Sequence, residues 1–200
     1  MRRRAIAWAL GAIASVSPVT AHAADNQIRP FIGSTFSGST TFVDNENGAG
    51  ASHFVIGVSW LRLGGMFGVE AEVADAPGFF EAGEKPLVLS SRVTTFTANF
   101  VVSAPRRYTE YIVRPYLVAG GGAMRVKKDD PLGVFAVDRL LPAFDVGAGA
   151  MMFLTNRVGF SGEIRRFQNL YRQTPETGLT FGSGERLSFW RGTFAFVYRY

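Results

Sequence analysis

The last seven residues of the chain, 194–200, constrain its fold more than any other stretch. Aromatic side chains stand at every second position, and the sequence stops on one of them. Alternate side chains of a β-strand point to opposite faces, so the four rings share one face. A soluble domain would have to bury that face, whereas hydrocarbon solvates aromatic rings directly. We therefore expect a strand whose outer face meets lipid, with the rings of Phe194, Phe196, Tyr198 and Tyr200 on it.

The first 23 residues have the layout of a secretory signal peptide. Three arginines form a basic start, residues 5–14 form an apolar run, and Ala21-His22-Ala23 supplies small residues around a cleavage site. We expect cleavage between Ala23 and Ala24, so that residues 24–200 form the mature domain. The apolar run is too short for a transmembrane anchor, because a spanning helix needs about 20 residues.

Composition narrows the possible function classes. Without the three leader arginines, 18 Lys and Arg stand against 16 Asp and Glu, and no basic patch indicates a nucleic-acid partner. The chain has no cysteine, which excludes disulfides, thiolate metal sites and a lipid-modified cysteine. The longest apolar run after the leader, 146–154, is too short for a membrane-spanning helix. A membrane protein of this composition must be a closed barrel, in which every backbone group finds a partner.

Eight segments alternate between an apolar face and a polar or small one, as the strands of a transmembrane barrel do. The clearest four are 54–61, 67–74, 95–102 and 144–154. The weaker four are 28–37, 111–124, 158–167 and 187–200. Strands of about ten residues, tilted by about 45°, match the thickness of the apolar band of an outer membrane.

The connections between these segments alternate in length. Long polar ones lie near 38–51, 75–89, 125–141 and 169–186. Short ones lie near 63–65, 104–110 and 155–157. Short periplasmic turns and longer external loops are the asymmetry of outer-membrane barrels. The pattern predicts an all-β fold, an eight-stranded antiparallel up-and-down transmembrane β-barrel with both termini on the periplasmic side.

Three motifs carry a family resemblance. Residues 114–122 read Arg-Pro-Tyr-Leu-Val-Ala-Gly-Gly-Gly, residues 144–150 form a second Gly-rich segment, and Glu163 is followed by the pair Arg166-Phe167. The chain resembles the eight-stranded outer-membrane barrel family that includes OmpA-like, Opa-like and Omp25-like surface proteins. The resemblance covers the mature chain and implies a barrel without the peptidoglycan-binding domain of full-length OmpA proteins. It also implies that the terminal aromatics Phe194, Phe196, Tyr198 and Tyr200 form the signal read by the barrel-assembly machinery.

The alternation directs seven charged side chains into the barrel. An eight-stranded barrel is just wide enough for side chains to fill its interior. We expect an ion-pair network that fills the lumen, with inward glycines making room for the long side chains. The alternative is a narrow polar path for small solutes. The expected network consists of Glu70, Glu72, Arg114, Asp145, Glu163, Arg165 and Arg199.

The sequence does not favour an enzyme. The acyl chemistry of lipid-modifying barrels needs a nucleophile beside a base, and His53 is the one histidine after the leader. Its neighbour Ser52 leaves the opposite face of a strand. We expect His53 and Ser59 to be three inter-residue pairs apart along the strand, with their side chains on opposite faces. We expect no catalytic residue, cofactor or metal ion, and place His53 at the outer rim.

If side chains fill the lumen, the external loops remain for recognition. Phe79 and Phe80 are expected at the headgroup level or against a partner, and basic rim residues against lipopolysaccharide phosphates. We expect a monomeric, non-enzymatic outer-membrane protein for surface interaction or envelope integrity. Its expected partners are outer-membrane lipids, lipopolysaccharide and the barrel-assembly machinery, without nucleic acid. The alternatives are a narrow barrel for small or hydrophobic solutes and a lipid-modifying enzyme.

Overall fold

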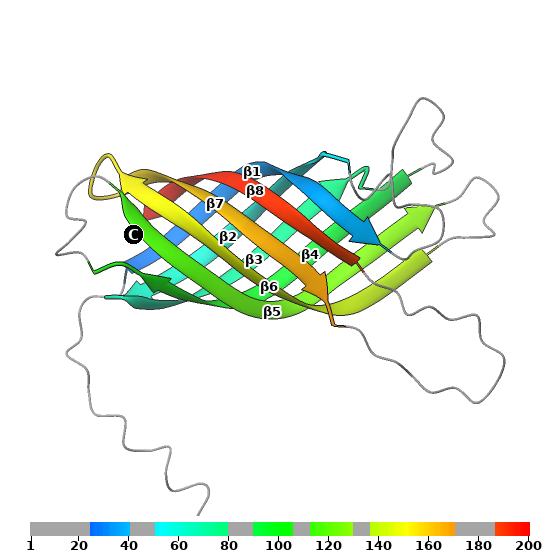
Figure 1. Cartoon of the computed structure of the whole chain (residues 1–200). Coiled ribbons are helices and arrows are strands. Elements are labelled where there is room, and N and C mark those ends of the chain that lie inside the picture. Colours follow the sequence, from blue (N-terminus) through cyan, green and yellow to red (C-terminus); the bar gives the residue numbers. More distant parts are fainter. Residues whose placement is uncertain (1–24, 41–50, 80–89, 106–112, 130–136, 171–186) are drawn as a thin grey trace, which may run out of the picture.

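The computed structural model describes residues 25–40, 51–79, 90–105, 113–129, 137–170 and 187–200. Its strands form one sheet that closes on itself (Figure 1). No helix within these ranges is long and apolar enough to cross a bilayer. The signal peptide and its cleavage site lie outside the described residues and stay a prediction.

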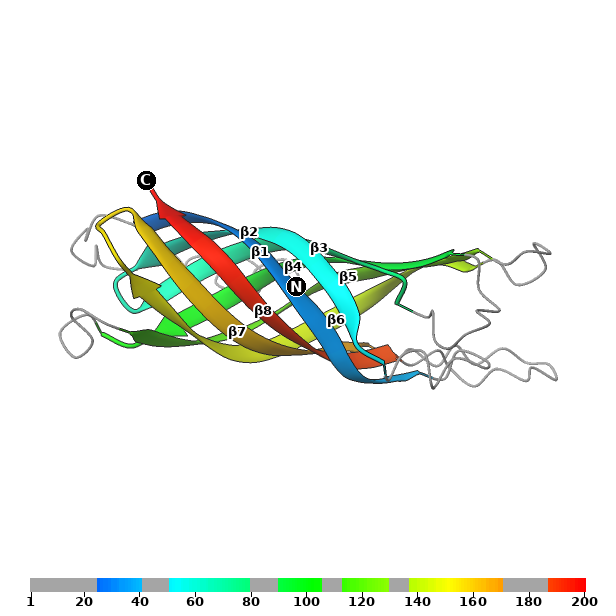
Figure 2. The same ribbon diagram turned by 90° about the horizontal axis from the view of Figure 1, so that it is seen from above.

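Each strand pairs antiparallel with the next one in the chain, and the first pairs with the last. Figure 2 shows the same closed wall from a second direction, with the strands crossing at a strong tilt. The predicted eight-stranded antiparallel barrel is thereby confirmed. The strands are β1 Asp25–Thr40, β2 His53–Gly64, β3 Phe67–Pro77, β4 Ser90–Ser103, β5 Arg114–Asp129, β6 Val137–Phe153, β7 Val158–Asn169 and β8 Leu187–Arg199.

The two ends of the barrel differ. At one end, here called the turn end, lie the short β2–β3 and β6–β7 turns and the C-terminus, marked C in Figure 1, and Asp25 pairs there with Leu63. Gly65 turns the chain there with a positive φ of 69°, and the Tyr200 backbone N–H donates to the Asn26 carbonyl at 3.0 Å. The opposite end, here called the loop end, is where β1, β3, β5 and β7 finish.

Several strands run further toward the loop end than the sequence pattern predicts. β5 and β6 stay paired up to Lys128 and Val137, inside the expected connection 125–141. Met124 and Val126 keep the inward alternation, whereas Arg125 and Lys127 face outward. Charged outward residues remove the apolar half of the pattern, although backbone pairing continues. The end of hydrophobic alternation therefore marks the end of the apolar band, not of the strand.

The outer face is apolar along the predicted positions. Phe54 and Phe194 are 55 % and 56 % exposed, whereas their chain neighbours Val55 and Ala195 are buried. Aromatic and β-branched residues suit the pleated surface of a strand, and here their large side chains lie on the convex side. The barrel therefore presents its apolar face outward, as a membrane protein does.

The core lies inside the barrel in two apolar clusters. The cluster toward the turn end contains Leu61, Leu63, Val101, Tyr116, Val118 and Met151, with Phe153 packed against it. The larger cluster, toward the loop end, includes Phe31, Val55, Phe79, Met124, Phe167 and Phe189.

Phe79 corrects one expectation, because its ring does not lie at the headgroup level. It is fully buried, with its centroid 5.1 Å from that of Phe189 and 5.3 Å from that of His53. Gly78, with a φ of 69°, turns the chain just before it, and the Gly78 N–H donates to Ser91 at 2.7 Å. This turn directs the ring into the loop-end cluster. Phe80 lies outside the described residues.

Candidate functional site

Arg165 on β7 lies at the centre of a group of carboxylates inside the barrel. Its Nη2 is 2.5 Å from Glu70 Oε1 and 3.5 Å from Glu72 Oε2, and its Nη1 is 3.2 Å from Asp145 Oδ2. Nε and Nη2 both donate to Glu163, the latter at 2.9 Å. The side chain is 1 % exposed. Arg165 thus joins four acidic side chains from β3, β6 and β7.

Arg29 on β1 connects to the same group from the other side of the closing seam. It pairs with Glu70, and its Nε donates to Ser59 Oγ at 3.1 Å. Its Nη1 lies 3.4 Å from the Tyr116 hydroxyl, which donates to Glu163 Oε2 at 2.9 Å. Arg29, Tyr116, Glu163, Arg165 and Glu70 therefore form a closed ring of polar contacts across the lumen.

Arg191 on β8 is the third buried arginine of the group. Its Nη2 is 2.5 Å from Glu72 Oε1, and its guanidinium lies over the rings of Phe167 and Phe31, 4.5 Å and 5.2 Å from their centroids. Such stacking suits a guanidinium that is poorly supplied with acceptors. The charged layer, as we name it, consists of Arg29, Glu70, Glu72, Asp145, Glu163, Arg165 and Arg191.

The sequence interpretation missed Arg29 and Arg191, although a signal for both was present. Arg191 is eight positions before Arg199, an even spacing that gives both the same strand face. Arg29 lies between the outward residues Ile28 and Pro30, so the period of two directs it inward. In both segments apolar and polar residues alternate only weakly, which hides the inward direction of the two arginines.

Arg114 and Arg199 lie apart from the charged layer, at the turn end. Arg114 Nε donates to the Ala104 carbonyl at 2.9 Å, and its Nη2 donates to Gly65. Arg199 Nε is 2.5 Å from Asp25 Oδ1, and its guanidinium lies 3.8 Å from the Phe153 ring centroid. Both are at strand ends, so they share the inward face with the layer but not its depth in the barrel.

Glycines on the inner face leave room for the large side chains of the interior. A Cβ at Gly147 would lie 2.6 Å from Arg165 Cγ, and one at Gly149 would lie 2.6 Å from Tyr116 Cζ. One at Gly57 would lie 2.4 Å from Phe31 Cζ. These distances are shorter than real carbon contacts, so a larger residue would push the neighbour away. The expectation that inward glycines make room agrees with this geometry.

His53 lies at the loop end with its ring against Phe79. Ser52 points outward, where its Oγ is 2.6 Å from that of Ser34. Ser59 is inward like His53, contrary to the expectation of opposite faces, because a spacing of six positions is even. Six residues of strand nevertheless separate the two side chains by about 20 Å. Within the described ranges, no three histidine or acidic side chains form a group that could hold a metal ion.

Comparison with known families identifies the barrel. Residues 8–189 match the family described as outer membrane protein beta-barrel domain. The chain belongs to this family. The protein is therefore an outer-membrane β-barrel of a Gram-negative-type envelope, and its apolar outer face meets lipid. Comparison with curated protein sequences gives no match.

Solved outer-membrane barrels share the fold. OprG from Pseudomonas aeruginosa is 13 % identical with a TM-score of 0.58, over 90 % of this chain and 98 % of that one. Neisserial surface protein A is 13 % identical with a TM-score of 0.56, over 86 % and 95 %. The N-terminal barrel of Pseudomonas aeruginosa OprF is 11 % identical with a TM-score of 0.53, over 87 % and 97 %. At such low identity, these likenesses concern the fold alone.

Proposed function

We propose that this outer-membrane barrel is a non-enzymatic protein with a closed lumen, which acts through its loop end in surface interaction or envelope integrity. The charged layer carries the proposal. Three guanidinium groups and four carboxylates lie between two apolar clusters, so a solute would have to cross both kinds of barrier. Separating buried ion pairs is costly, because the low-dielectric interior offers no water to replace the partner.

The packing beside Arg191 supports a closed lumen. A cavity of about 10 Å³ lies there, lined by Val55, Phe189 and other residues of β1 to β4 and β8. A single water needs about 10–15 Å³, so this space holds one water at most. Beside Arg191 the packing therefore leaves no room for a continuous file of waters.

The absence of a catalytic role in our proposal rests on the placement of the candidate groups. His53 packs on Phe79 inside the barrel, whereas Ser52 faces outward and hydrogen-bonds with Ser34. Ser59 accepts a hydrogen bond from Arg29 at mid-barrel. Acyl transfer needs a nucleophile within hydrogen-bond reach of its base, and neither serine meets this condition with His53.

Conductance tests the closed lumen. We expect purified wild-type protein in planar bilayers to give no steady channel current, because the charged layer and its apolar flanks block the axis. The variant Glu72→Ala with Arg191→Ala removes both members of one buried pair and should admit a small current. Truncating the exposed residue Arg62 to Ala is the matched control and should leave the bilayer silent. A steady, solute-dependent flux through the wild-type barrel would overturn the proposal.

The second part of the proposal concerns assembly, for which we infer that Phe194, Phe196, Tyr198 and Tyr200 form the recognition signal. Tyr200 lies on the outer wall, and its hydroxyl is 3.2 Å from Trp60 Nε1. Tyr200→Ser keeps the backbone hydrogen bond to Asn26 but removes the terminal ring. We expect several-fold less folded protein in the outer membrane, measured by gel mobility with and without boiling.

Tyr200→Phe is the matched control for this experiment. It keeps the ring and loses only the contact with Trp60, so assembly should stay near the wild-type level. Equal assembly of the serine and phenylalanine variants would show that the terminal ring is not part of the signal.

A further inference from the structure

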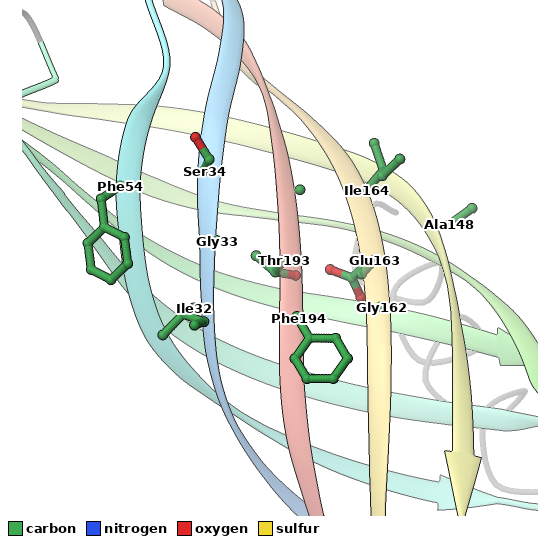
Figure 3. A pocket seen from close by; sticks show the side chains of 11 residues that line it. Ile32, Gly33, Ser34, Phe54, Ala148, Gly162, Glu163, Ile164, Thr193 and Phe194 are labelled. Atoms are coloured by element: carbon green, nitrogen blue, oxygen red, sulfur yellow. The ribbon is translucent and has the colours of Figure 1, made fainter.

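A groove of about 690 Å³ lies on the outer wall of the barrel, over β1, β7 and β8 (Figure 3). Two neighbouring rungs of the sheet form it. Ser34, Gly192 and Ile164 are paired in one rung, and Ile32, Phe194 and Gly162 in the other. Small residues make the floor, so the groove reaches the backbone, while larger apolar side chains form its rims. Figure 3 shows Phe54, Ile32 and Phe194 along one part of this rim and Ile164 along another.

The fold does not require the two glycines of the groove floor. A Cβ at Gly162 would have no atom within 4 Å, and one at Gly192 would meet Phe36 Cε1 at an ordinary 3.6 Å. Their φ angles are not positive. Gly33 on the neighbouring strand differs, since its Cβ would lie 2.1 Å from the Gly192 carbonyl oxygen. A glycine in a strand interior makes the fold less stable than a larger residue would. The two glycines therefore keep the floor of the groove open at some cost in stability.

The chemistry around the groove changes toward the loop end. Arg166 and Trp190 are paired one outward position beyond Ile164 and Gly192, and the guanidinium lies 5.7 Å from the Trp190 ring centroid. Toward the turn end the wall is aromatic, with Phe160 stacked on Phe194 at 5.5 Å. A cation beside an aromatic ring at one end of an apolar groove matches a lipid with an anionic headgroup.

We propose that this outer groove binds one phosphorylated glycolipid of the outer leaflet, lipid A, with an acyl chain over Gly162 and Gly192 and a phosphate at Arg166. The wall lies in lipid, so the groove is filled by acyl chain unless protein covers it. With the loop end outward, as expected for this family, Arg166 lies at the headgroup level of the leaflet that contains lipid A. The inference goes beyond the proposed function and does not depend on a closed lumen.

Native mass spectrometry of the protein, extracted from outer membranes in mild detergent, tests the site. Wild type should retain one lipid A per barrel. Gly162→Leu with Gly192→Leu fills the groove, since both positions have room for a Cβ, and should lower the retained fraction about tenfold. Arg166→Gln should lower it by a similar factor, because a charge-assisted contact to phosphate is lost.

Two variants on other parts of the wall serve as controls. Ala98→Leu places a leucine on the outward face of β4, away from the groove, and Arg62→Gln removes an outward charge near the turn end. Both should retain lipid A like the wild type, and gel mobility without boiling verifies that each variant is folded. Since Arg166→Gln changes no packing in the core, it tests the site even if the leucine variant assembles poorly.

Three results would overturn the inference. The first is equal retention of lipid A by wild type and the groove variants. The second is retention of zwitterionic phospholipid alone. The third is a cross-linked dimer through Ser34→Cys, since a second copy of the chain would then occupy the groove.

Discussion

Replacing Arg165 with methionine should lower the free energy of unfolding of the barrel by about 3–5 kcal/mol. The guanidinium contacts Glu70, Glu72, Asp145 and Glu163, and its removal leaves buried negative charges without their counter-ion. Methionine keeps much of the volume, so the loss reports charge more than cavity formation. Urea unfolding of the protein in lipid vesicles, followed by tryptophan fluorescence and gel mobility, measures the effect.

Further substitutions that restore part of the lost stability would show which carboxylates cause the loss in Arg165→Met. Glu70 keeps Arg29 and Glu72 keeps Arg191, whereas Asp145 and Glu163 have no second arginine among the contacts of the described residues. Adding Asp145→Asn and Glu163→Gln to the Arg165→Met variant should therefore restore part of the stability. Arg157→Met, in the exposed β6–β7 turn, should stay within about 0.5 kcal/mol of the wild type. A loss of less than about 1 kcal/mol in Arg165→Met would contradict a central role for this residue.

Gly147→Val should destabilise the barrel or prevent its assembly, although valine favours strands. A Cβ at this position would lie 2.5 Å from the Ile164 carbonyl oxygen and 2.6 Å from Arg165 Cγ. Overpacking of this kind costs about 1–3 kcal/mol, and here it also displaces the arginine from its carboxylates. The fraction of folded protein in outer membranes and the urea midpoint measure the loss.

Gly162→Val is the matched control on the neighbouring strand. The same side chain is added, but it enters lipid, where no atom lies within 4 Å of the new Cβ. We expect wild-type assembly and equal or higher stability. If both valine variants behaved alike, the inward packing around Arg165 would not limit which residues fit at Gly147.

The period of two in the sequence determined most of the fold that could be predicted. Alternate residues of a strand face lipid and the barrel interior, and lipid favours apolar side chains whereas the interior accepts polar ones. An even or odd position in the strand is therefore enough to place Phe54 outward and Glu70 inward. Strand number, closure and the outward aromatic face of β8 followed from this one signal. The ends of β5 and β6 did not, because their charged outward residues hide the pattern while the backbone pairing continues.

The partners within the charged layer could not be predicted from the sequence. The alternation along a strand gives the face of a residue but not its depth along the barrel axis. That depth depends on the register and stagger of all eight strands. Arg114 and Arg165 have the same inward direction, yet one donates to carbonyls near the turns and the other binds carboxylates at mid-barrel. Phe79 was placed wrongly because a single positive φ at Gly78 reverses the direction that a loop residue takes.

The ring of contacts through Arg29, Glu70 and Arg165 has a consequence for how the chain reaches its native state. Its members come from β1, β3, β5 and β7, so the ring cannot exist in a sheet that is still open. Until the first and last strands meet, Arg165 has only Glu163 on its own strand and Asp145 on β6, and its contact with Glu70 across the barrel is missing. The contacts across the lumen should therefore form together, in the step that pairs β1 with β8.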